Sequence, residues 1–207
     1  MENDTRSKLL EIATPLFATK GFTAVSIREL TDAAQINVSA ISYHFNGKEG
    51  LYQAVLAEQL APILQALQAA KSNAALSPIE RLTFYANQIA RIHAQRPFLA
   101  RFMISEVTNP TNYGGPIIEA HLSQVYEFMK DTLQEGITQG NFRADLNLNY
   151  AAISLAGILN FYFITKPLIQ KFIPLKPEAN TEYVDHAFHV YLHGIMNHSP
   201  SKKLSQP

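Results

Sequence analysis

The sequence predicts an all-α protein of about nine helices, in which a three-helix helix-turn-helix region precedes a larger helical domain. Apolar residues recur at three- and four-residue spacing, and after residue 52 no segment of any length alternates as a strand would. Proline, glycine and asparagine signals separate the helical segments. We expect residues 1–50 to form the helix-turn-helix domain, 51–198 a helical effector-binding and dimerisation domain, and 199–207 a disordered tail.

Composition narrows the possible classes of protein. The 207 residues are 47% hydrophobic, which is ample for a folded core, and the absence of cysteine excludes disulfides and thiolate chemistry. The amino terminus is polar and acidic, unlike a secretory signal. The longest apolar run, Ala151–Ile164, is shorter than the roughly 20 residues that cross a bilayer, so we expect a buried helix and a cytoplasmic protein.

The first helix is predicted from about Thr5 to Lys20. Pro15 lies inside it and removes one backbone donor, so a local kink is expected. Gly21 suits the left-handed position that follows a helix. The apolar face of this helix comprises Leu9, Ile12, Ala13, Leu16 and Phe17.

Two short helices follow, joined by a tight turn. Ser26 and Glu29 form an S-x-x-E capping box that starts the second helix. The turn is Gln35-Ile36, and Asn37 is a good N-cap for a helix that runs from Val38 to about His44. A capped helix pair of this kind, with an exposed second helix, is a device for reading the major groove of DNA.

The exposed face of that second helix is small and largely uncharged. Val38 can meet a thymine methyl group, and serine hydroxyls can bond to either type of base. Tyr43 and Lys48 are candidates for phosphate contacts, which position a protein without specifying sequence. Residues 1–50 carry five basic and six acidic side chains, so DNA binding must depend on locally placed groups. The DNA-contact candidates are Ser26, Arg28, Asn37, Val38, Ser39, Ser42, Tyr43, His44 and Lys48.

Two short capped helices could also serve only to build a core, but a longer pattern favours the DNA-binding interpretation. That pattern is A-x-x-L-F-x-x-x-G-F from Ala13 to Phe22, S-I-R-E-L from Ser26, and Y-H-F-x-x-K-E-x-L from Tyr43. With these motifs the stretch Leu10 to Leu51 resembles the DNA-binding domain of the TetR family of bacterial transcription regulators. Gln35 departs from the family by replacing the usual glycine of the turn, which predicts slight strain, and Gly50 replaces a residue that favours helix more strongly.

The resemblance implies a homodimer, held by the last two helices, that binds double-stranded operator DNA and responds to a small-molecule effector. It implies most readily a repressor, whose two recognition helices lie one DNA turn apart. A weaker resemblance, around Glu106 to Pro110 and Asn160 to Tyr162, links the remaining chain to the sensor domains of one TetR subset and identifies no ligand.

The rest of the chain divides into further helices. A helix from Lys48 to about Ala70 contains Pro62, and Ser77 opens the next with a second capping box. The remaining helices are predicted at about 97–107, 116–139, 147–164 and 181–197. The segment at 147–164 is apolar nearly all round and must be covered on all sides, so we expect it to face both the effector-binding core and a second subunit.

Soft and aromatic side chains on these helices are candidates for an effector pocket, which would suit an apolar or aromatic molecule. The alternative is that each is an ordinary core residue, because aromatic stripes at helical spacing usually are. The candidates are Phe98, Phe102, Met103, Tyr126, Met129, Phe161 and Tyr162.

His186, His189 and His193 share one face of the last helix and could bind zinc or nickel. A polar face at a dimer boundary is the favoured interpretation, so no metal and no cofactor are expected. An all-α enzyme is the second hypothesis, but the chain has no G-x-S-x-G, glycine-rich phosphate loop or H-E-x-x-H motif, and we expect no enzymatic activity. A helical adaptor without DNA binding is the third.

Overall fold

The computed structural model describes residues 2–176 and 178–197, and within these ranges it contains nine helices and no β-strand. The predicted all-α class is therefore confirmed, whereas the predicted tail at 199–207 lies outside the described residues. The helices are α1 (Glu2–Lys20), α2 (Ile27–Ala34), α3 (Ser39–Phe45), α4 (Lys48–Ser72), α5 (Pro78–Gln95), α6 (Leu99–Thr108), α7 (Gly115–Thr138), α8 (Leu148–Ile169) and α9 (Ala179–Ile195).

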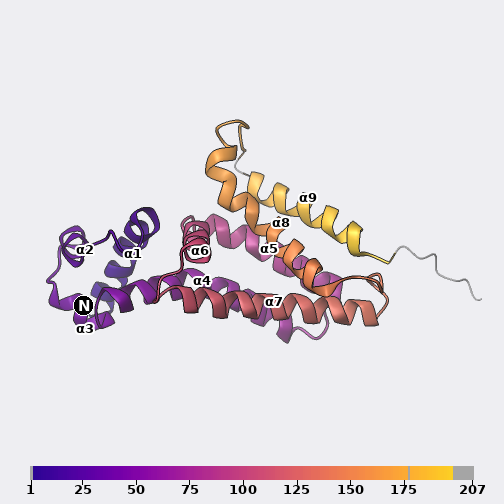
Figure 1. Cartoon of the computed structure of the whole chain (residues 1–207), viewed down its shortest axis with the longest axis horizontal. Helices are drawn as coiled ribbons and strands as arrows, with labels where there is room; N and C mark the ends of the chain where they lie inside the picture. The colour runs from indigo at the N-terminus through magenta and orange to yellow at the C-terminus, as the bar shows by residue number, and fades with distance from the viewer. Residues whose placement is uncertain (1, 177, 198–207) are drawn as a thin grey trace, which may run out of the picture.

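The molecule is elongated, with α1, α2 and α3 gathered at one end (Figure 1). The long helix α4 leaves this end and runs beside α7 through the body of the molecule. Helices α8 and α9 pack against each other, and α5 contacts both of them as well as α4 and α7. Because α4 belongs to both ends, any change in its tilt moves α1–α3 relative to the remaining helices.

Two hydrophobic cores divide the chain at α4. The smaller core joins α1–α3 to the first two turns of α4, as far as Leu56, and receives Phe102 from α6. The larger core runs from Leu60 of α4 to Ile195 of α9. The core of the helix-turn-helix end therefore extends past residue 50 into α4.

Three of the predicted helix starts are confirmed, each where the sequence placed a capping residue. The Ser26 hydroxyl accepts a hydrogen bond from the Glu29 N–H at 3.1 Å. Ser77 and Glu80 form a complete capping box, in which each side chain bonds to the other residue's backbone N–H. The Asn147 side chain accepts from the Tyr150 N–H at 3.1 Å and begins α8. These side chains satisfy donors that have no partner inside a helix.

Helix α8 is longer than the sequence analysis predicted. It continues past Ile164 to Ile169 with Pro167 inside it, so the inference that this segment is too short to span a bilayer was wrong. By length and composition alone this helix of 22 residues, which contains an 18-residue window with a mean hydropathy of 1.5, could cross a membrane. In the structure the buried side of α8 packs against α7, α9, α6 and α5.

Candidate DNA-binding surface and effector cavity

Helix α3 is held against the body by the residues predicted to face inward. Ile41 is fully buried and Phe45 is 6% exposed, so both belong to the smaller core. Between α2 and α3, Gln35 adopts the left-handed conformation with φ 52° and ψ 49°. A residue with a Cβ atom pays a steric cost there that glycine avoids. The predicted strain at Gln35 is thus confirmed as a left-handed backbone.

The side chain of Asn37 bonds to the first residue of α3. Its carboxamide oxygen accepts from the Ser39 N–H at 2.9 Å and from the Ser39 hydroxyl at 3.0 Å. The helix nevertheless begins one residue later than predicted, at Ser39, and Val38 rather than Asn37 occupies the N-cap position. The Asn37 and Ser39 side chains are exposed, so the same pair can turn toward a ligand at the cost of these local bonds.

The predicted outer face of α3 is presented to solvent. Val38 is 53% exposed and Tyr43 is 72% exposed, and Ser42 lies exposed between them on the same side of the molecule. The Tyr43 ring packs edge-on against His44, with 4.9 Å between ring centroids, while His44 itself is only partly exposed. This face offers a methyl group, hydroxyls and a phenol, and it carries no full charge.

The basic candidates on either side of α3 differ from one another. Arg28 projects from α2 with 90% of its side chain exposed, and it lies 3.7 Å from Asp32 in a weak surface pair. Lys48 instead turns inward, where its ammonium group donates to the carbonyls of Phe22 and Val25 at 3.0 and 2.8 Å. It also lies 4.3 Å from the centroid of the Phe22 ring. Lys48 therefore fastens the segment between α1 and α2 to α4.

Gly50 explains how closely α3 sits against α4. A Cβ atom built on Gly50 would lie 1.7 Å from the carbonyl oxygen of Phe45, the last residue of α3. No side chain can be accommodated at that distance without moving the backbone. What the sequence analysis noted as a loss of helix propensity is required for the close approach of the two helices.

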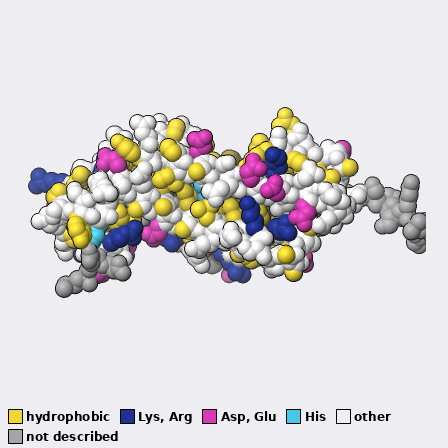
Figure 2. Space-filling model, turned by 90° about the horizontal axis from the view of Figure 1, so that it is seen from below, with side chains coloured by type: hydrophobic (Ala, Val, Ile, Leu, Met, Phe, Trp, Pro, Cys, Tyr) yellow, Lys and Arg dark blue, Asp and Glu magenta, His cyan; other side chains and the backbone are white. Residues whose placement is uncertain are grey.

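Arg6 was missed by the sequence analysis. Its guanidinium lies 5.3 Å from the centroid of the Phe45 ring and so places a cation beside the end of α3. A cation in the first turns of α1 was the only signal in the sequence. The face shown in Figure 2 carries basic and acidic side chains interspersed, and no continuous basic field.

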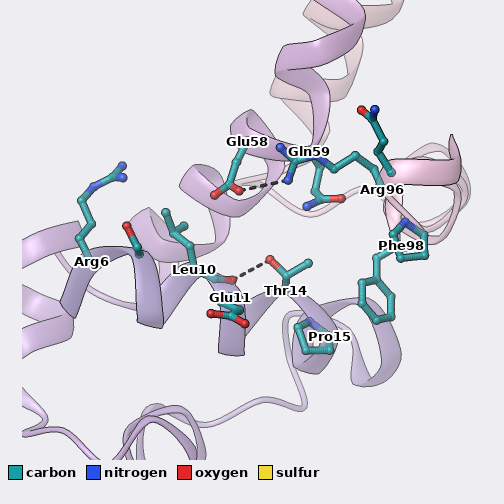
Figure 3. A pocket seen from close by; sticks show the side chains of 12 residues that line it. Arg6, Leu10, Glu11, Thr14, Pro15, Glu58, Gln59, Arg96 and Phe98 are labelled. Atoms are coloured by element: carbon teal, nitrogen blue, oxygen red, sulfur yellow. Dashed lines mark hydrogen bonds and ion pairs between the residues drawn. The ribbon is translucent and has the colours of Figure 1, made fainter. Parts of the chain in front are cut away.

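A cleft of about 600 Å³ separates α1 from α4 and from the turn between α5 and α6. In Figure 3, Glu58 and Gln59 of α4 lie across the cleft from Leu10 and Thr14 of α1. Arg96 closes one side by donating to Glu58 at 3.1 Å. The cleft lies where α1 meets α4 and the turn between α5 and α6.

A separate apolar cavity of about 250 Å³ lies among α5, α6, α7 and α8. Of the seven predicted pocket residues, only Met103 lines it. Its lining comprises His93, Ala100, Met103, Ile104, Val107, Leu122, Ala156, Asn160 and Ile164.

The other six predicted pocket residues are dispersed. Phe102 and Met129 are buried in the two cores, and Phe98 lines the cleft beside α1. Phe161 is 64% exposed on the outer side of α8. The Tyr126 hydroxyl donates to Asn149 at 2.7 Å. The Tyr162 ring stacks on Tyr183 with centroids 4.2 Å apart.

His93 and Asn160 are the polar residues of the cavity wall. His93 makes two contacts there. Its ring stacks on Phe163 with centroids 3.9 Å apart and planes 9° apart, and its Nε2 lies 3.3 Å from the side-chain oxygen of Asn160. Burial is the main reason why the pKa of His93 falls from 6.5 to about 4, although the Asn160 bond opposes this shift. The imidazole is therefore neutral at physiological pH.

Helix α6 connects this cavity to the helix-turn-helix end. One side of α6 lines the cavity through Met103, while Phe102 on the other side packs into the smaller core. Glu106 is 3% exposed, and its carboxylate accepts from the Tyr52 hydroxyl of α4 at 2.5 Å and from the Thr111 N–H at 2.8 Å. A displacement of α6 by an occupant of the cavity would thus reach α4 directly.

His186, His189 and His193 lie on the exposed face of α9, as predicted. The rings of His189 and His193 meet edge-on with centroids 4.4 Å apart. Over the described ranges, no group of three or more histidine, cysteine, aspartate or glutamate side chains comes together in an arrangement that could hold a metal ion.

Comparison with known proteins agrees with this architecture. Residues 9–55 match the family described as bacterial regulatory proteins, tetR family. The chain is 28% identical over 178 residues to the Bacillus subtilis protein named "Probable HTH-type transcriptional regulator YttP", and the match covers 86% of each chain.

Two solved structures share the fold. The ketosteroid transcriptional regulator KstR2 of Mycobacterium tuberculosis matches with a TM-score of 0.72 at 21% identity, over 92% of this chain and 94% of that one. AibR, solved in complex with isovaleryl coenzyme A and operator DNA, matches with a TM-score of 0.72 at 16% identity, over 90% and 97%.

A capped helix-turn-helix with an exposed recognition helix, joined through α4 to a helical domain, defines a DNA-binding transcriptional regulator. Its residues 9–55 form a DNA-binding domain of the tetR family of bacterial regulatory proteins.

Proposed function

We propose that this protein is a cytoplasmic, homodimeric repressor that leaves its operator when a small apolar effector enters the cavity among α5–α8. Residues 1–50 would bind DNA, and residues 51–198 would bind the effector and form the dimer. The observation that carries this proposal is the position of α6, which lines the cavity on one side and holds Tyr52 of α4 on the other.

DNA binding would use the exposed face of α3. Val38, Ser39 and Ser42 would reach base edges, while Tyr43 and His44 would lie toward the phosphates. Arg28 of α2 would contribute a phosphate contact, with Ser26 and Asn37 near the backbone at the two helix starts. Lys48 would act by fixing the fold, because its ammonium group is already bonded to two carbonyls.

The mechanism would be a shift between two arrangements of α4. An effector that fits only the arrangement with a displaced α6 moves the population toward that arrangement. Glu106 would transmit the displacement to Tyr52, and the tilt of α4 would change the separation of the two recognition helices. Effector and operator would then oppose each other through one coupling free energy. AibR, which shares the fold, was solved with an acyl coenzyme A and DNA together.

The dimer would form through the outward faces of α8 and α9. Tyr150, Ile153 and Phe161 expose 61–70% of their surface along α8, and Val190 exposes 55% on α9. At Gly157, also on α8, an added Cβ would meet no described atom within 4 Å, so a second helix could approach closely there. Apolar side chains in this number on one face indicate a protein partner.

The central experiment is a gel shift and footprint with DNA from upstream of the protein's own gene. Saturable binding to a site with two half-sites about one DNA turn apart is expected. Failure to protect any specific site would remove the proposal, as would a monomer in sedimentation analysis at the concentrations that bind DNA.

The role of α6 has its own test. Tyr52→Phe removes only the hydroxyl that bonds to Glu106. We expect the variant to retain operator binding but to respond less to effector. Tyr113→Phe is the matched control, since Tyr113 lies on the loop before α7 and its hydroxyl bonds to no described residue of α6. Equal loss of response in both variants would contradict transmission through Tyr52.

A further inference from the structure

A second hollow adjoins the apolar cavity. The cavity of about 250 Å³, here called the inner chamber, shares His93 and Ala100 with a hollow of about 150 Å³, here called the outer chamber. Neither reaches the roughly 300 Å³ at which ligand pockets usually begin, although together they do. A ligand of ordinary size would therefore occupy both chambers.

The two chambers differ in chemistry. The inner chamber is apolar apart from His93 and Asn160. The outer chamber is lined by the polar side chains of Lys166, Gln170 and Asn180 together with Phe163 and two prolines. An apolar interior with polar groups at one end matches a ligand that is itself apolar with one polar end.

Lys166 is the only lysine or arginine that lines either chamber within the described part of the chain. Its ammonium group donates to the side-chain oxygen of Asn180 at 2.7 Å, and this bond holds the end of α8 to the start of α9. An ammonium group has three donors, so this bond leaves it able to donate to a ligand. Among the described residues, no aspartate or glutamate lines either chamber to neutralise the charge.

The His93 ring, stacked on Phe163, stands between the two chambers. It is half-buried, and its lowered pKa keeps it neutral, so it does not compete with Lys166 as an anion-binding cation. Rotation of the ring out of the stack would connect the inner and outer chambers. A ligand that spans both would hold His93 away from Asn160, and this would couple occupancy to the packing of α5 against α8.

We infer that the effector is a carboxylate with an apolar tail, whose tail fills the inner chamber and whose carboxylate binds Lys166 in the outer chamber. This inference rests on the proposed function, because it identifies the chemical class of the effector for the same cavity. A charge-assisted bond between ammonium and carboxylate in a partly buried hollow is stronger than a bond between neutral groups.

Calorimetric titration of the full chain with octanoate and with octan-1-ol tests the inference, since these probes share a tail and differ in charge. Octanoate should bind more tightly than octan-1-ol. Lys166→Met should weaken octanoate about 10- to 100-fold and leave octan-1-ol unchanged, as expected for loss of one hydrogen bond to a charged group. Lys171→Met is the matched control, because Lys171 is exposed just beyond α8 and lines neither chamber.

The tail is tested separately with Ala156→Leu, which adds volume to the wall of the inner chamber. Both probes should then bind at least about 10-fold more weakly. Equal affinity of the two probes for the native protein, or octanoate binding that is insensitive to Lys166→Met, would overturn the inference.

Gel shifts without ligand separate this result from the proposed function. If the protein binds its operator but not octanoate, the proposed function stands and the inferred class of effector is wrong. If the protein binds no operator, the proposed function is wrong, whatever the titration shows.

Discussion

The helix-turn-helix end and the effector end of this molecule assemble their functional residues in different ways. The proposed DNA face comes mainly from one short stretch, Asn37 to His44, whose geometry depends on a cap and a turn. The inner chamber gathers residues from four helices, α5 to α8, that are separated by up to 71 positions in the chain, from His93 to Ile164. The first arrangement is local, whereas the second exists only after the helices have packed.

Because of this difference, different structural changes disrupt the two ends. The helix-turn-helix end loses its geometry when one turn, or the close approach of two helices, is disturbed. A cavity between helices fails when its walls move or when a buried group becomes charged.

Gly50→Ala should have the largest effect, because the new methyl group would overlap the carbonyl oxygen of Phe45. Overpacking against backbone costs about 3 kcal/mol or more of unfolding free energy. Urea denaturation measures this loss, and a gel shift should show more than about 10-fold weaker operator binding, since 1.4 kcal/mol is tenfold.

Ala57→Gly on the exposed side of the same helix is the control for Gly50→Ala. It carries only the helix-propensity cost of about 1 kcal/mol. If Gly50→Ala unfolded at the same urea concentration as the native protein, the close approach of α3 and α4 would not be a constraint in solution.

Acid should weaken the effector end through two histidines, the buried His121 and the half-buried His93. Burial lowers the pKa of both His93 and His121 from 6.5 to about 4. Because the folded pKa is below the unfolded one, their stabilising contribution is complete above pH 6.5 and is lost as pH falls toward 4. Each histidine adds up to about 1.4 kcal/mol per pH unit to the slope.

Urea unfolding of His121→Leu across this pH window measures that slope. His121 is 3% exposed, and its Nδ1 has no hydrogen-bond partner among the described residues, so the substitution removes a buried polar group. The slope of unfolding free energy against pH should fall by about half, because only the contribution of His93 then remains. An unchanged slope would mean that His121 is not buried and neutral in the folded protein.

Lys48→Met should destabilise the helix-turn-helix end by about 1.5–3 kcal/mol, the usual range for hydrogen bonds made by a charged group. It removes the donor to the carbonyls of Phe22 and Val25. The salt dependence of operator binding should stay unchanged, because a lost phosphate contact would reduce its logarithmic slope by about 0.9.

Arg28→Met is the comparison for Lys48→Met, since Arg28 is exposed and is a proposed phosphate contact. This variant should lower the salt slope and leave the unfolding free energy within about 0.5 kcal/mol of the native value. If instead Lys48→Met lowered the salt slope and Arg28→Met lowered the unfolding free energy, Lys48 would be the phosphate contact and Arg28 the structural residue.

Lys48 also shows what the sequence could not indicate. The caps at Ser26 and Ser77 are local, and their helix starts were predicted correctly, whereas α3 begins one residue later than predicted. The direction of the Lys48 side chain depends on two carbonyls more than twenty residues away, which only the folded chain places nearby.

The lining of the proposed effector cavity could not be predicted from the sequence for a related reason. Large aromatic side chains were chosen as its lining, but such side chains fill space. The inner chamber is left open by small residues, notably Ala100 and Ala156, at positions that no local pattern distinguishes from ordinary core. Its polar groups, His93 and Asn160, come from different helices and meet only through packing.

Gln35→Gly should have the smallest effect, and it tests the one departure in the turn that was visible in the sequence. The left-handed backbone at φ 52° costs a residue with a Cβ about 1–2 kcal/mol, and part of this is offset by the greater freedom of glycine in the unfolded chain. We expect a gain of about 0.5–1 kcal/mol in unfolding free energy with operator binding unchanged. Asn46→Gly is the control at a nearly identical φ of 58°, and it should gain less because asparagine tolerates this conformation. If Gln35→Gly destabilised the protein, contacts of the Gln35 side chain rather than backbone strain would govern the turn before the recognition helix.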